Sequence, residues 1–222
     1  METNKINNFE DFSCASKNLG IELNNNQLDL FKKYYKTLLE WNEKINLISR
    51  KEENILERHF LDSILFLPEM EGLINQTPTN VLDIGSGGGF PGIPLAIMKP
   101  EWHFTLCESI KKKAGFLIHL VKELNLKNVK VINDRVEAIH ELPLHKNKYD
   151  LITVRAIAKL DVLIKYSLPL LKKDGHLLAY KAKDIDEEIK DADNMIKKNN
   201  LKLKIFSKEI NGVERKLVVI QP

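Results

Sequence analysis

The stretch Val81-Leu82-Asp83-Ile84-Gly85-Ser86-Gly87-Gly88-Gly89-Phe90-Pro91-Gly92 carries the strongest fold signal in this chain. An apolar run with an acidic residue at its end is followed by closely spaced glycines and then by the start of a helix. A buried parallel strand explains the apolar run, and a glycine turn lets a ligand lie against bare backbone. The spacing Asp83-x-Gly85-x-Gly87-x-Gly89 is the one used by enzymes that bind S-adenosylmethionine. We therefore predict that Asp83, Gly85 and Gly87 contact this cofactor.

The same segment also contains Gly87-x-Gly89-x-x-Gly92, which satisfies the dinucleotide pattern G-x-G-x-x-G. That pattern normally opens directly after its strand, whereas here the apolar run stops at Ile84 and the match begins later. An acidic Asp83 would also repel a pyrophosphate, while it attracts the ammonium group of methionine. The position therefore favours S-adenosylmethionine over a nicotinamide cofactor, and a glycine-rich loop that merely turns the chain is the remaining alternative.

A second apolar run, residues 103–107, ends at Glu108. An acidic residue about 20 positions beyond the glycines, at the tip of the next strand, can accept hydrogen bonds from ribose hydroxyls. Glu108 is therefore predicted to bind the cofactor. Both candidate cofactors carry a ribose, so Glu108 does not separate them, but it argues against a featureless turn.

From residue 80 onward, short apolar runs alternate with helical segments, a pattern typical of βαβ units and a parallel sheet. Near the end, Asn211-Gly212 predicts a hairpin turn. The expected fold is α/β: a Rossmann-like class I methyltransferase sheet with an N-terminal helical extension and a C-terminal antiparallel hairpin. The expected strands cover residues 81–84, 103–107, 129–132, 149–154, 176–180, 201–206 and 216–220.

Residues 1–75 are predicted to form the helical extension, and residues 76–222 the methyltransferase domain. In the extension, an apolar stripe from Phe31 to Ile45 recurs at three- and four-residue steps. Asn26 is expected to cap that helix, and Ser49-x-x-Glu52 predicts a second helix that runs to Pro68. A surplus of basic residues suggests that this segment faces RNA, with solubility as the alternative: Lys32, Lys33, Lys36, Lys44, Arg50, Lys51 and Arg58.

The bulk composition of the 222 residues is that of an ordinary globular protein, 43% hydrophobic and 29% charged, with a formal charge of +3. No apolar stretch is long enough for a membrane span, and residues 1–10 lack the apolar region of a signal peptide. Cys14 and Cys107 have no CxxC spacing, and the histidines show no HExxH pattern, so no metal is expected. We expect a cytoplasmic monomer that binds no membrane.

The carboxyl ends of the strands are where an open α/β sheet places its site. After strands three and four these ends carry Asn133-Asp134-Arg135-Val136-Glu137 and Thr153-Val154-Arg155-Ala156. Neither holds the Asn-Pro-Pro-aromatic motif of amino-group methylases, and no cysteine is placed as a nucleophile for carbon methylation. The predicted target is therefore an atom that is already nucleophilic. Arg155 has independent support as a site residue, because a guanidinium at a strand tip needs an anionic or stacked partner.

Taken together, these residues resemble the bacterial small-subunit ribosomal RNA guanine-N7 methyltransferases, also called the glucose-inhibited division protein B family. The resemblance covers nearly the whole chain, and the Phe-Pro-Gly-Ile-Pro that follows the glycines makes it specific. It rests on Trp41-Asn42-x-x-x-Asn46-Leu47, Arg58-His59-x-x-Asp62-Ser63, residues 83–94, Glu108-Ser109-x-x-Lys112-Lys113, Arg135-Val136-Glu137 and Arg155-Ala156.

The resemblance implies methyl transfer from S-adenosylmethionine to N7 of a guanine in 16S ribosomal RNA, with the RNA or the small subunit as partner. The alternatives are a noncatalytic RNA- or nucleotide-binding protein on the same fold and an NAD-type oxidoreductase. It implies cofactor contacts at Gly85, Phe90, Val136, Glu137 and Arg155. On the RNA side it implies Asn46, His59, Arg135, Arg155 and Lys181, to which charge adds Arg58; Arg155, His59, Asn46 and Lys181 are the expected catalytic residues. His59 has the alternative of a structural, half-buried side chain. Two positions depart from the family pattern: Ile48 replaces Thr, and Ala182 replaces Gly.

Overall fold

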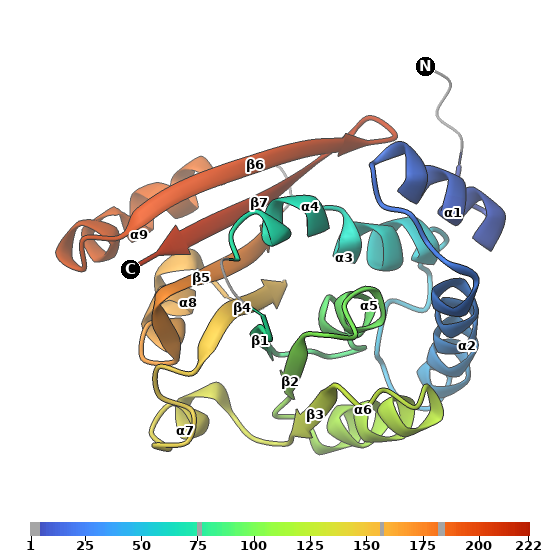
Figure 1. Ribbon diagram of the computed structural model, residues 1–222, viewed down its shortest axis with the longest axis horizontal. Helices are drawn as coiled ribbons and strands as arrows, with labels where there is room; N and C mark the ends of the chain where they lie inside the picture. The colour runs from blue at the N-terminus through green and yellow to red at the C-terminus, as the bar shows by residue number, and fades with distance from the viewer. Residues whose placement is uncertain (1–4, 75–76, 156–157, 182–184) are drawn as a thin grey trace.

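The computed structural model describes residues 5–74, 77–155, 158–181 and 185–222. Its centre is one seven-stranded sheet in the order β3-β2-β1-β4-β5-β7-β6, seen in Figure 1. The first five strands pair in parallel, and β7 runs antiparallel to both β5 and β6. The predicted class I methyltransferase fold is confirmed.

The strands follow the apolar runs of the sequence closely. Strands β1 and β4 are each one residue longer than predicted, and β5 and the two hairpin strands extend several residues beyond their apolar centres. The turn between the hairpin strands has positive φ at Asn211 (49°) and Gly212 (76°), as a tight hairpin turn requires. The strands are β1 (Asn80–Ile84), β2 (His103–Cys107), β3 (Val129–Ile132), β4 (Tyr149–Arg155), β5 (Leu171–Lys181), β6 (Lys202–Ile210) and β7 (Val213–Gln221).

Helices cover both faces of the sheet (Figure 1). On one face pack α7 (Val136–Ile139), α8 (Leu160–Ser167) and α9 (Asp186–Lys198). On the other face lie α1 (Phe9–Asn18), α2 (Asn25–Asn42), η1 (Leu56–Leu61), α3 (Asp62–Ile64), α4 (Leu67–Glu71), α5 (Gly92–Met98) and α6 (Lys111–Glu123). This two-sided cover explains why β1 and β4 are buried almost throughout.

The N-cap of helix α2 lies two residues before the expected one. Asn24, rather than Asn26, is the N-cap. Its side chain accepts a hydrogen bond from the Gln27 N–H at 2.9 Å, and the Asn24 N–H donates to the Gln27 side chain at 3.0 Å. This reciprocal pair is a capping box formed by Asn and Gln. The prediction missed it because Asn24 to Asn26 are all good caps by residue type.

The prediction of one helix from Ser49 to Pro68 is wrong. The Glu52 N–H donates to the Ser49 carbonyl at 3.1 Å, which makes a turn, and the Glu52 carboxylate pairs with Arg58 at 2.8 Å. Regular helix begins only with η1, a π-helix, and continues into α3. Pro68 lies in the first turn of α4 instead of ending a helix, because the first turn requires no proline N–H.

One hydrophobic core joins the N-terminal helices to the sheet. Phe12, Phe31 and Phe60 from the helices belong to the same buried cluster as Phe104 and Phe116, which follow the glycine segment. The connector at residues 75 and 76 lies outside the described residues. The packing joins the two segments through one core. The division into a helical extension, residues 1–75, and a methyltransferase domain, residues 76–222, therefore stays a prediction.

Candidate active site

The site lies at the carboxyl ends of the parallel strands, where the strand order reverses between β1 and β4. Two cavities open there. Because Ile84 pairs with Val154 in the sheet, the glycine loop after β1 and Arg155 at the end of β4 are neighbours. Residues 156 and 157, including the quoted Ala156, lie outside the described residues.

The glycine loop adopts backbone angles that only glycine accepts readily. Gly85, Gly87 and Gly89 have φ of 66°, 53° and 97°. A Cβ on Gly89 would lie 2.7 Å from the Tyr34 hydroxyl, and that hydroxyl donates to the Gly88 carbonyl at 2.5 Å. The loop is thus held by a buried tyrosine of α2. A Cβ on Gly87 would meet only the Gly85 carbonyl, at 3.8 Å, so the loop leaves space on its open side.

Glu108 ties the glycine loop to β2. Its carboxylate accepts from the Gly87 N–H and from the Ile110 N–H, each at 2.8 Å, and the residue is buried. This places Glu108 next to the loop, as predicted. Its two bonds leave further lone pairs, so ribose binding is compatible with the geometry and stays a prediction.

Asp83 lies near the end of β1, as the sequence predicted. The residue is fully buried, and one carboxylate oxygen, Oδ1, accepts from the Thr153 hydroxyl at 2.8 Å. Burial raises the pKa of Asp83 to about 6, and the hydrogen bonds oppose that shift. A Cβ on Gly92 would lie 2.8 Å from Oδ2, so the carboxylate is covered by the start of α5. In this geometry Asp83 bonds the end of β1 to β4 through Thr153, and its contact with the cofactor stays a prediction.

The first cavity, of about 250 Å³, lies between the glycine loop and the ends of β2 and β3. Four predicted residues line it: Gly85, Arg135, Val136 and Glu137. Ser109 and Asp134 also line it, and both stand in motifs that the sequence analysis quoted. The sequence did not single out the rest of the lining as site residues, which is Ile84, Cys107, Leu163 and Tyr166. Tyr166 was out of reach of motif analysis because α8 brings it from a distant part of the chain.

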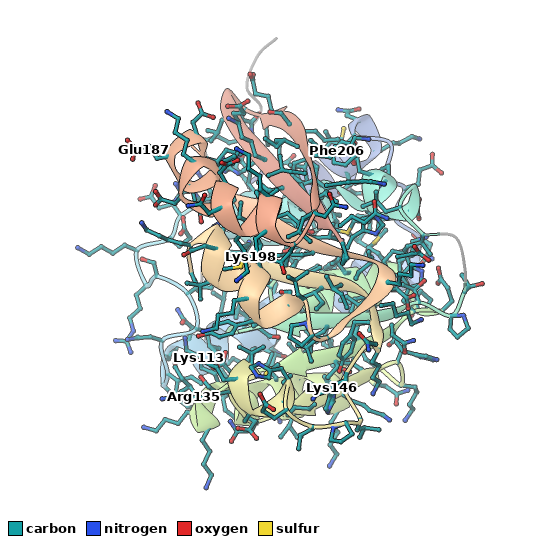
Figure 2. All side chains as sticks on the ribbon, turned by 90° about the vertical axis from the view of Figure 1, so that its left-hand side faces the viewer. Lys113, Arg135, Lys146, Glu187, Lys198 and Phe206 are labelled. Atoms are coloured by element: carbon teal, nitrogen blue, oxygen red, sulfur yellow. The ribbon has the colours of Figure 1, made fainter. Side chains whose placement is uncertain are left out.

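Residues of the cavity wall form hydrogen bonds with one another. The Cys107 thiol donates to the Asp134 carbonyl at 3.3 Å, and burial raises its pKa to about 12. A hydrogen bond with Glu137 raises the pKa of Tyr166. Figure 2 shows Arg135 at the surface, toward the edge of the view where Lys113 also lies. This cavity therefore combines the glycine backbone at Gly85 with the acidic side chains of Asp134 and Glu137, and the binding of the adenosyl end of the cofactor there stays a prediction.

The second cavity, of about 430 Å³, is rich in cations. Predicted RNA-side residues line it, namely Arg58, His59, Arg155 and Lys181, together with residues that the sequence did not single out for this site: Glu52, Asp62, Phe66, Tyr180, Arg215 and Lys216. Arg215 and Lys216 come from the closing hairpin. Their positive charge was visible in the sequence, but only the antiparallel pairing of β7 with β5 brings them beside Lys181.

Arg155 is the most highly connected side chain of this cavity. Nη1 donates to the Asp62 carboxylate and to the Arg58 carbonyl, each at 3.2 Å. Nη2 donates to Nδ1 of His59 at 2.7 Å, and the guanidinium lies 5.2 Å from the centre of the Phe90 ring. The expected anionic and stacked partners are therefore both present.

His59 is held in one tautomer by Arg155. Because a guanidinium only donates, Nδ1 of His59 must accept and Nε2 must carry the proton. Burial lowers the pKa of His59 to about 4, and the nearby Arg155 adds to this shift. His59 is thus neutral at neutral pH. Its Nε2 has no hydrogen-bond acceptor in the described part of the chain, and a Glu52 oxygen lies 3.7 Å away.

Asp62 holds a second guanidinium. Its Oδ1 accepts from Nε of Arg215 at 3.0 Å, while Oδ2 faces Arg155. Burial raises the pKa of Asp62, although both arginines oppose the shift. The carboxylate therefore joins the start of α3 to the end of β4 and the start of β7.

Phe90 and Asn46, two other predicted residues, line neither of these two cavities. Phe90 is buried and packs against Tyr34, Phe60 and His59, so its ring supports the loop from within. Asn46 is exposed and does not line the second cavity, although the Leu47 carbonyl beside it lies 3.5 Å from a Cβ placed on Gly88.

Lys181 lines the cavity but is already paired: its ammonium lies 2.5 Å from the Glu188 carboxylate and 3.1 Å from the Ala158 carbonyl. Ala182, the departure that follows it, lies outside the described residues. Arg58 is largely exposed and pairs with Glu52.

Two lysines of α2 form ion pairs away from this site. Lys33 pairs with Glu123 at 3.0 Å, and Lys32 pairs with Asp29 at 3.5 Å. Helix α6 starts at the carboxyl edge of the sheet after β2, so Glu123 at its far end marks the opposite edge. By contrast Lys44, Arg50 and Lys51 flank the segment that contacts the glycine loop.

Two general features of the described ranges complete the site description. No helix in them has the length and apolar character needed to cross a membrane. Among the same residues, no group of three or more His, Cys, Asp or Glu side chains is arranged to hold a metal ion.

Comparisons with known proteins agree with this arrangement. The family model for rRNA small subunit methyltransferase G matches residues 27–218. The chain is 39% identical, over 96% of its length and 90% of the relative, to ribosomal RNA small subunit methyltransferase G of Lactococcus lactis subsp. cremoris. It is 42% identical, over 90% of its length and 86% of the relative, to the protein of the same name from Roseiflexus castenholzii.

The fold is also found among solved structures. The human methyltransferase 10 domain containing protein matches with a TM-score of 0.62 at 16% identity, covering 90% of this chain and 99% of that one. The family match covers most of the chain, and it agrees with the glycine loop, the strand order and the cofactor-sized cavity. The chain belongs to the rRNA small subunit methyltransferase G family, whose members depend on S-adenosylmethionine.

Proposed function

We propose that this protein transfers the methyl group of S-adenosylmethionine to N7 of a guanine in 16S ribosomal RNA. The observation that supports this most is the pair of cavities on adjacent strand tips. One is built on glycine backbone and suits the cofactor, and the other is lined by cations and suits a nucleotide of RNA. Ile84 and Val154, which pair in the sheet, bring the two together.

The proposed mechanism needs no general base. The cofactor supplies an electrophilic methyl group, and guanine N7 carries an in-plane lone pair and no proton. The residues therefore act by holding the base in line with that methyl group, which is catalysis by proximity and orientation. Arg155 donates a hydrogen bond to O6 of the flipped-out guanine. Neutral His59 accepts from Arg155 and so keeps the guanidinium in place.

The remaining partners follow from this proposal. Ribosomal RNA, free or in the small subunit, approaches the cationic cavity and the exposed Arg58. Arg135 extends the cationic surface to the cofactor cavity. We propose roles for Asn46 at the glycine loop and for Lys181 beside the base, in a protein that works as a monomer in the cytoplasm.

The direct test is nucleoside mass spectrometry of 16S RNA from cells lacking this protein. We expect one N7-methylguanosine to disappear and to return when purified protein and S-adenosylmethionine are added to the small subunits. A methyl group found on a carbon or an exocyclic amine would contradict the proposal. Under single-turnover conditions, the rate should also lack an ascending limb near neutral pH, and a tenfold rise per pH unit would reveal a general base that we exclude.

A further inference from the structure

Asp62 is a buried carboxylate that the proposed methyl transfer does not itself require. It lines the cationic cavity, and its side chain is 13% exposed. Its two oxygens are held apart by Arg155 on one side and Arg215 on the other, at 3.2 and 3.0 Å. The carboxylate therefore has a fixed position and orientation at the cavity wall.

Both members of the Arg155–Asp62 pair keep unused hydrogen-bonding capacity. A carboxylate offers about four acceptor positions, and a guanidinium five donors. Among the described residues, Asp62 accepts one bond on each oxygen. Arg155 uses three N–H groups, toward Asp62, the Arg58 carbonyl and His59, which leaves its Nε–H and one N–H of Nη2. The cavity wall thus presents a donor directly beside an acceptor.

This order of donor and acceptor matches guanine and opposes adenine. Guanine presents the O6 acceptor beside the N1–H donor, whereas adenine presents an amino donor beside the N1 acceptor. O6 also neighbours N7, the atom to be methylated. We propose that Asp62 selects guanine by accepting a hydrogen bond from N1–H while Arg155 donates to O6. This inference rests on the proposed function and adds to it the residue that determines base specificity.

Arg215 is the positioning residue in this arrangement. It comes from β7, while Asp62 comes from the N-terminal helices, so the specificity pair depends on the closing hairpin. Without Arg215 the carboxylate would keep only one of its two fixed contacts. An adenine in the cavity would place its amino group toward Arg155 and its N1 lone pair toward Asp62, so both contacts would be repulsive.

The first experiment compares guanine with adenine at the target position. Small subunits carrying either base are methylated under single-turnover conditions by the wild type and by Asp62→Asn. The amide can turn its NH₂ toward adenine N1, so we expect the guanine-over-adenine rate ratio to fall by at least about tenfold. A merely structural loss would lower both rates and leave the ratio unchanged, which would overturn the inference.

The matched control is Asp150→Asn. Asp150 is also a partly buried carboxylate, paired with Lys172 at 2.8 Å, but it stands at the start of β4 on the opposite edge of the sheet. We expect this variant to keep the wild-type base ratio. A similar fall in the ratio for Asp150→Asn would mean that any loss of buried charge relaxes specificity, and would overturn the role of Asp62.

A second measurement uses only the wild-type protein and so does not depend on folding of a variant. Ribosomal RNA is ligated from a synthetic segment that carries 1-methylguanine or hypoxanthine at the target. We expect 1-methylguanine, which lacks N1–H, to react at least about tenfold more slowly than guanine, and hypoxanthine, which keeps O6 and N1–H, to react at a similar rate. Equal rates for guanine and 1-methylguanine would overturn the inference.

The outcomes separate the two proposals. If the wild type makes no N7-methylguanosine, the proposed function fails. If it does, but neither the base ratio nor the 1-methylguanine rate changes as expected, the function stands and Asp62 is only a structural ion-pair partner.

Discussion

At the scale of the residue, the site depends on groups whose positions are fixed by other groups. Arg155 is bonded on two nitrogens and stacked on Phe90, and it fixes the tautomer of His59. The backbone at Gly92 is also closely packed against its neighbours, because a Cβ there would overlap Leu106 and approach Asp83. Each of these arrangements leads to a measurable prediction.

The first prediction concerns His59, whose folded-state pKa of about 4 lies below its usual 6.5. Between these values the unfolded chain binds a proton that the folded chain does not, so stability falls as pH drops from about 6.5 to about 4. The loss amounts to at most about 3 kcal/mol. In His59→Gln this loss is absent. The free energy of unfolding of the variant relative to wild type should therefore rise as the pH falls from about 6.5 to about 4, as measured by urea denaturation at several pH values.

Asp83 acts in the opposite direction and serves as an internal check. Its folded-state pKa of about 6 is above the usual 3.8, so its contribution is present at low pH and is lost as pH rises from about 4 to about 6. Both wild type and His59→Gln contain Asp83, and the difference between them removes its effect. A stability difference that stays constant between pH 4 and pH 7 would show that His59 is not buried in its neutral form.

The second prediction compares two glycines. Gly92→Ala should lower the free energy of unfolding by about 1–3 kcal/mol, because its Cβ would lie 2.8 Å from Asp83 and would also overlap Leu106. Gly115→Ala in α6 has nothing within 4 Å and should stabilise by about 0.5–1 kcal/mol. Urea denaturation measures both, and equal effects at the two positions would contradict the packing at Gly92.

At the scale of the element, helix α2 is part of the cofactor site although no residue of it lines the cavity. Its buried Tyr34 donates to the Gly88 carbonyl and stacks on Phe90 at 5.2 Å. Its C-terminal end is closed by Asn42, whose side chain accepts from the N–H groups of Leu47 and Ile48. Through these contacts helix α2 holds the glycine loop in its position at the end of the sheet.

The third prediction tests this role with Tyr34→Phe. The variant leaves the buried Gly88 carbonyl without its hydrogen bond, at a cost of about 1–3 kcal/mol. We expect weaker S-adenosylmethionine binding in calorimetry, because the loop loses its support. The control is Thr37→Val on the same helix, whose hydroxyl bonds only the Lys33 carbonyl within α2. If both variants bind the cofactor as wild type does, the helix does not position the loop.

At the scale of the whole molecule, one hydrophobic core joins the N-terminal helices to the sheet. The shared core includes Phe60 from the N-terminal helices and Phe104 from β2, so the helices cannot move independently of the sheet. The basic residues of the N-terminal segment fall into two groups, which lie at opposite edges of the sheet. Lys32 and Lys33 are paired at the edge away from the site, whereas Lys44, Arg50 and Lys51 lie near the glycine loop.

The fourth prediction follows from this division and concerns RNA binding. Each phosphate contact contributes roughly 0.7–0.9 to the slope of log affinity against log salt. Changing Lys44, Arg50 and Lys51 to Ala should therefore flatten that slope by about 2, measured by filter binding to small subunits. The matched triple variant of Lys32, Lys33 and Lys36 should keep the wild-type slope, and equal flattening by both would mean that RNA covers both edges.

The sequence alone predicted the sheet, the hairpin and the cofactor loop, because these depend on local patterns. An apolar strand run, glycines that need positive φ and an Asn-Gly turn are each readable within a few residues. The helix expected from Ser49 to Pro68 failed for a tertiary reason: Glu52 pairs with Arg58 instead of capping a helix, and the cavity is built around that pair. The cap of α2 failed because neighbouring asparagines are equivalent in sequence.

Tertiary structure alone decided how the predicted residues work together. The sequence pointed to Arg155 and His59 but could not show that one fixes the tautomer of the other. It quoted Asp62 as part of a motif, and it did not single out Arg215, which lies 153 positions further on and meets the same carboxylate. Hydrophobic periodicity and glycine spacing are local, so the sequence itself determined the fold and the cofactor. A shared ion pair depends on which distant strands become neighbours, so only the folded chain determined the cationic cavity.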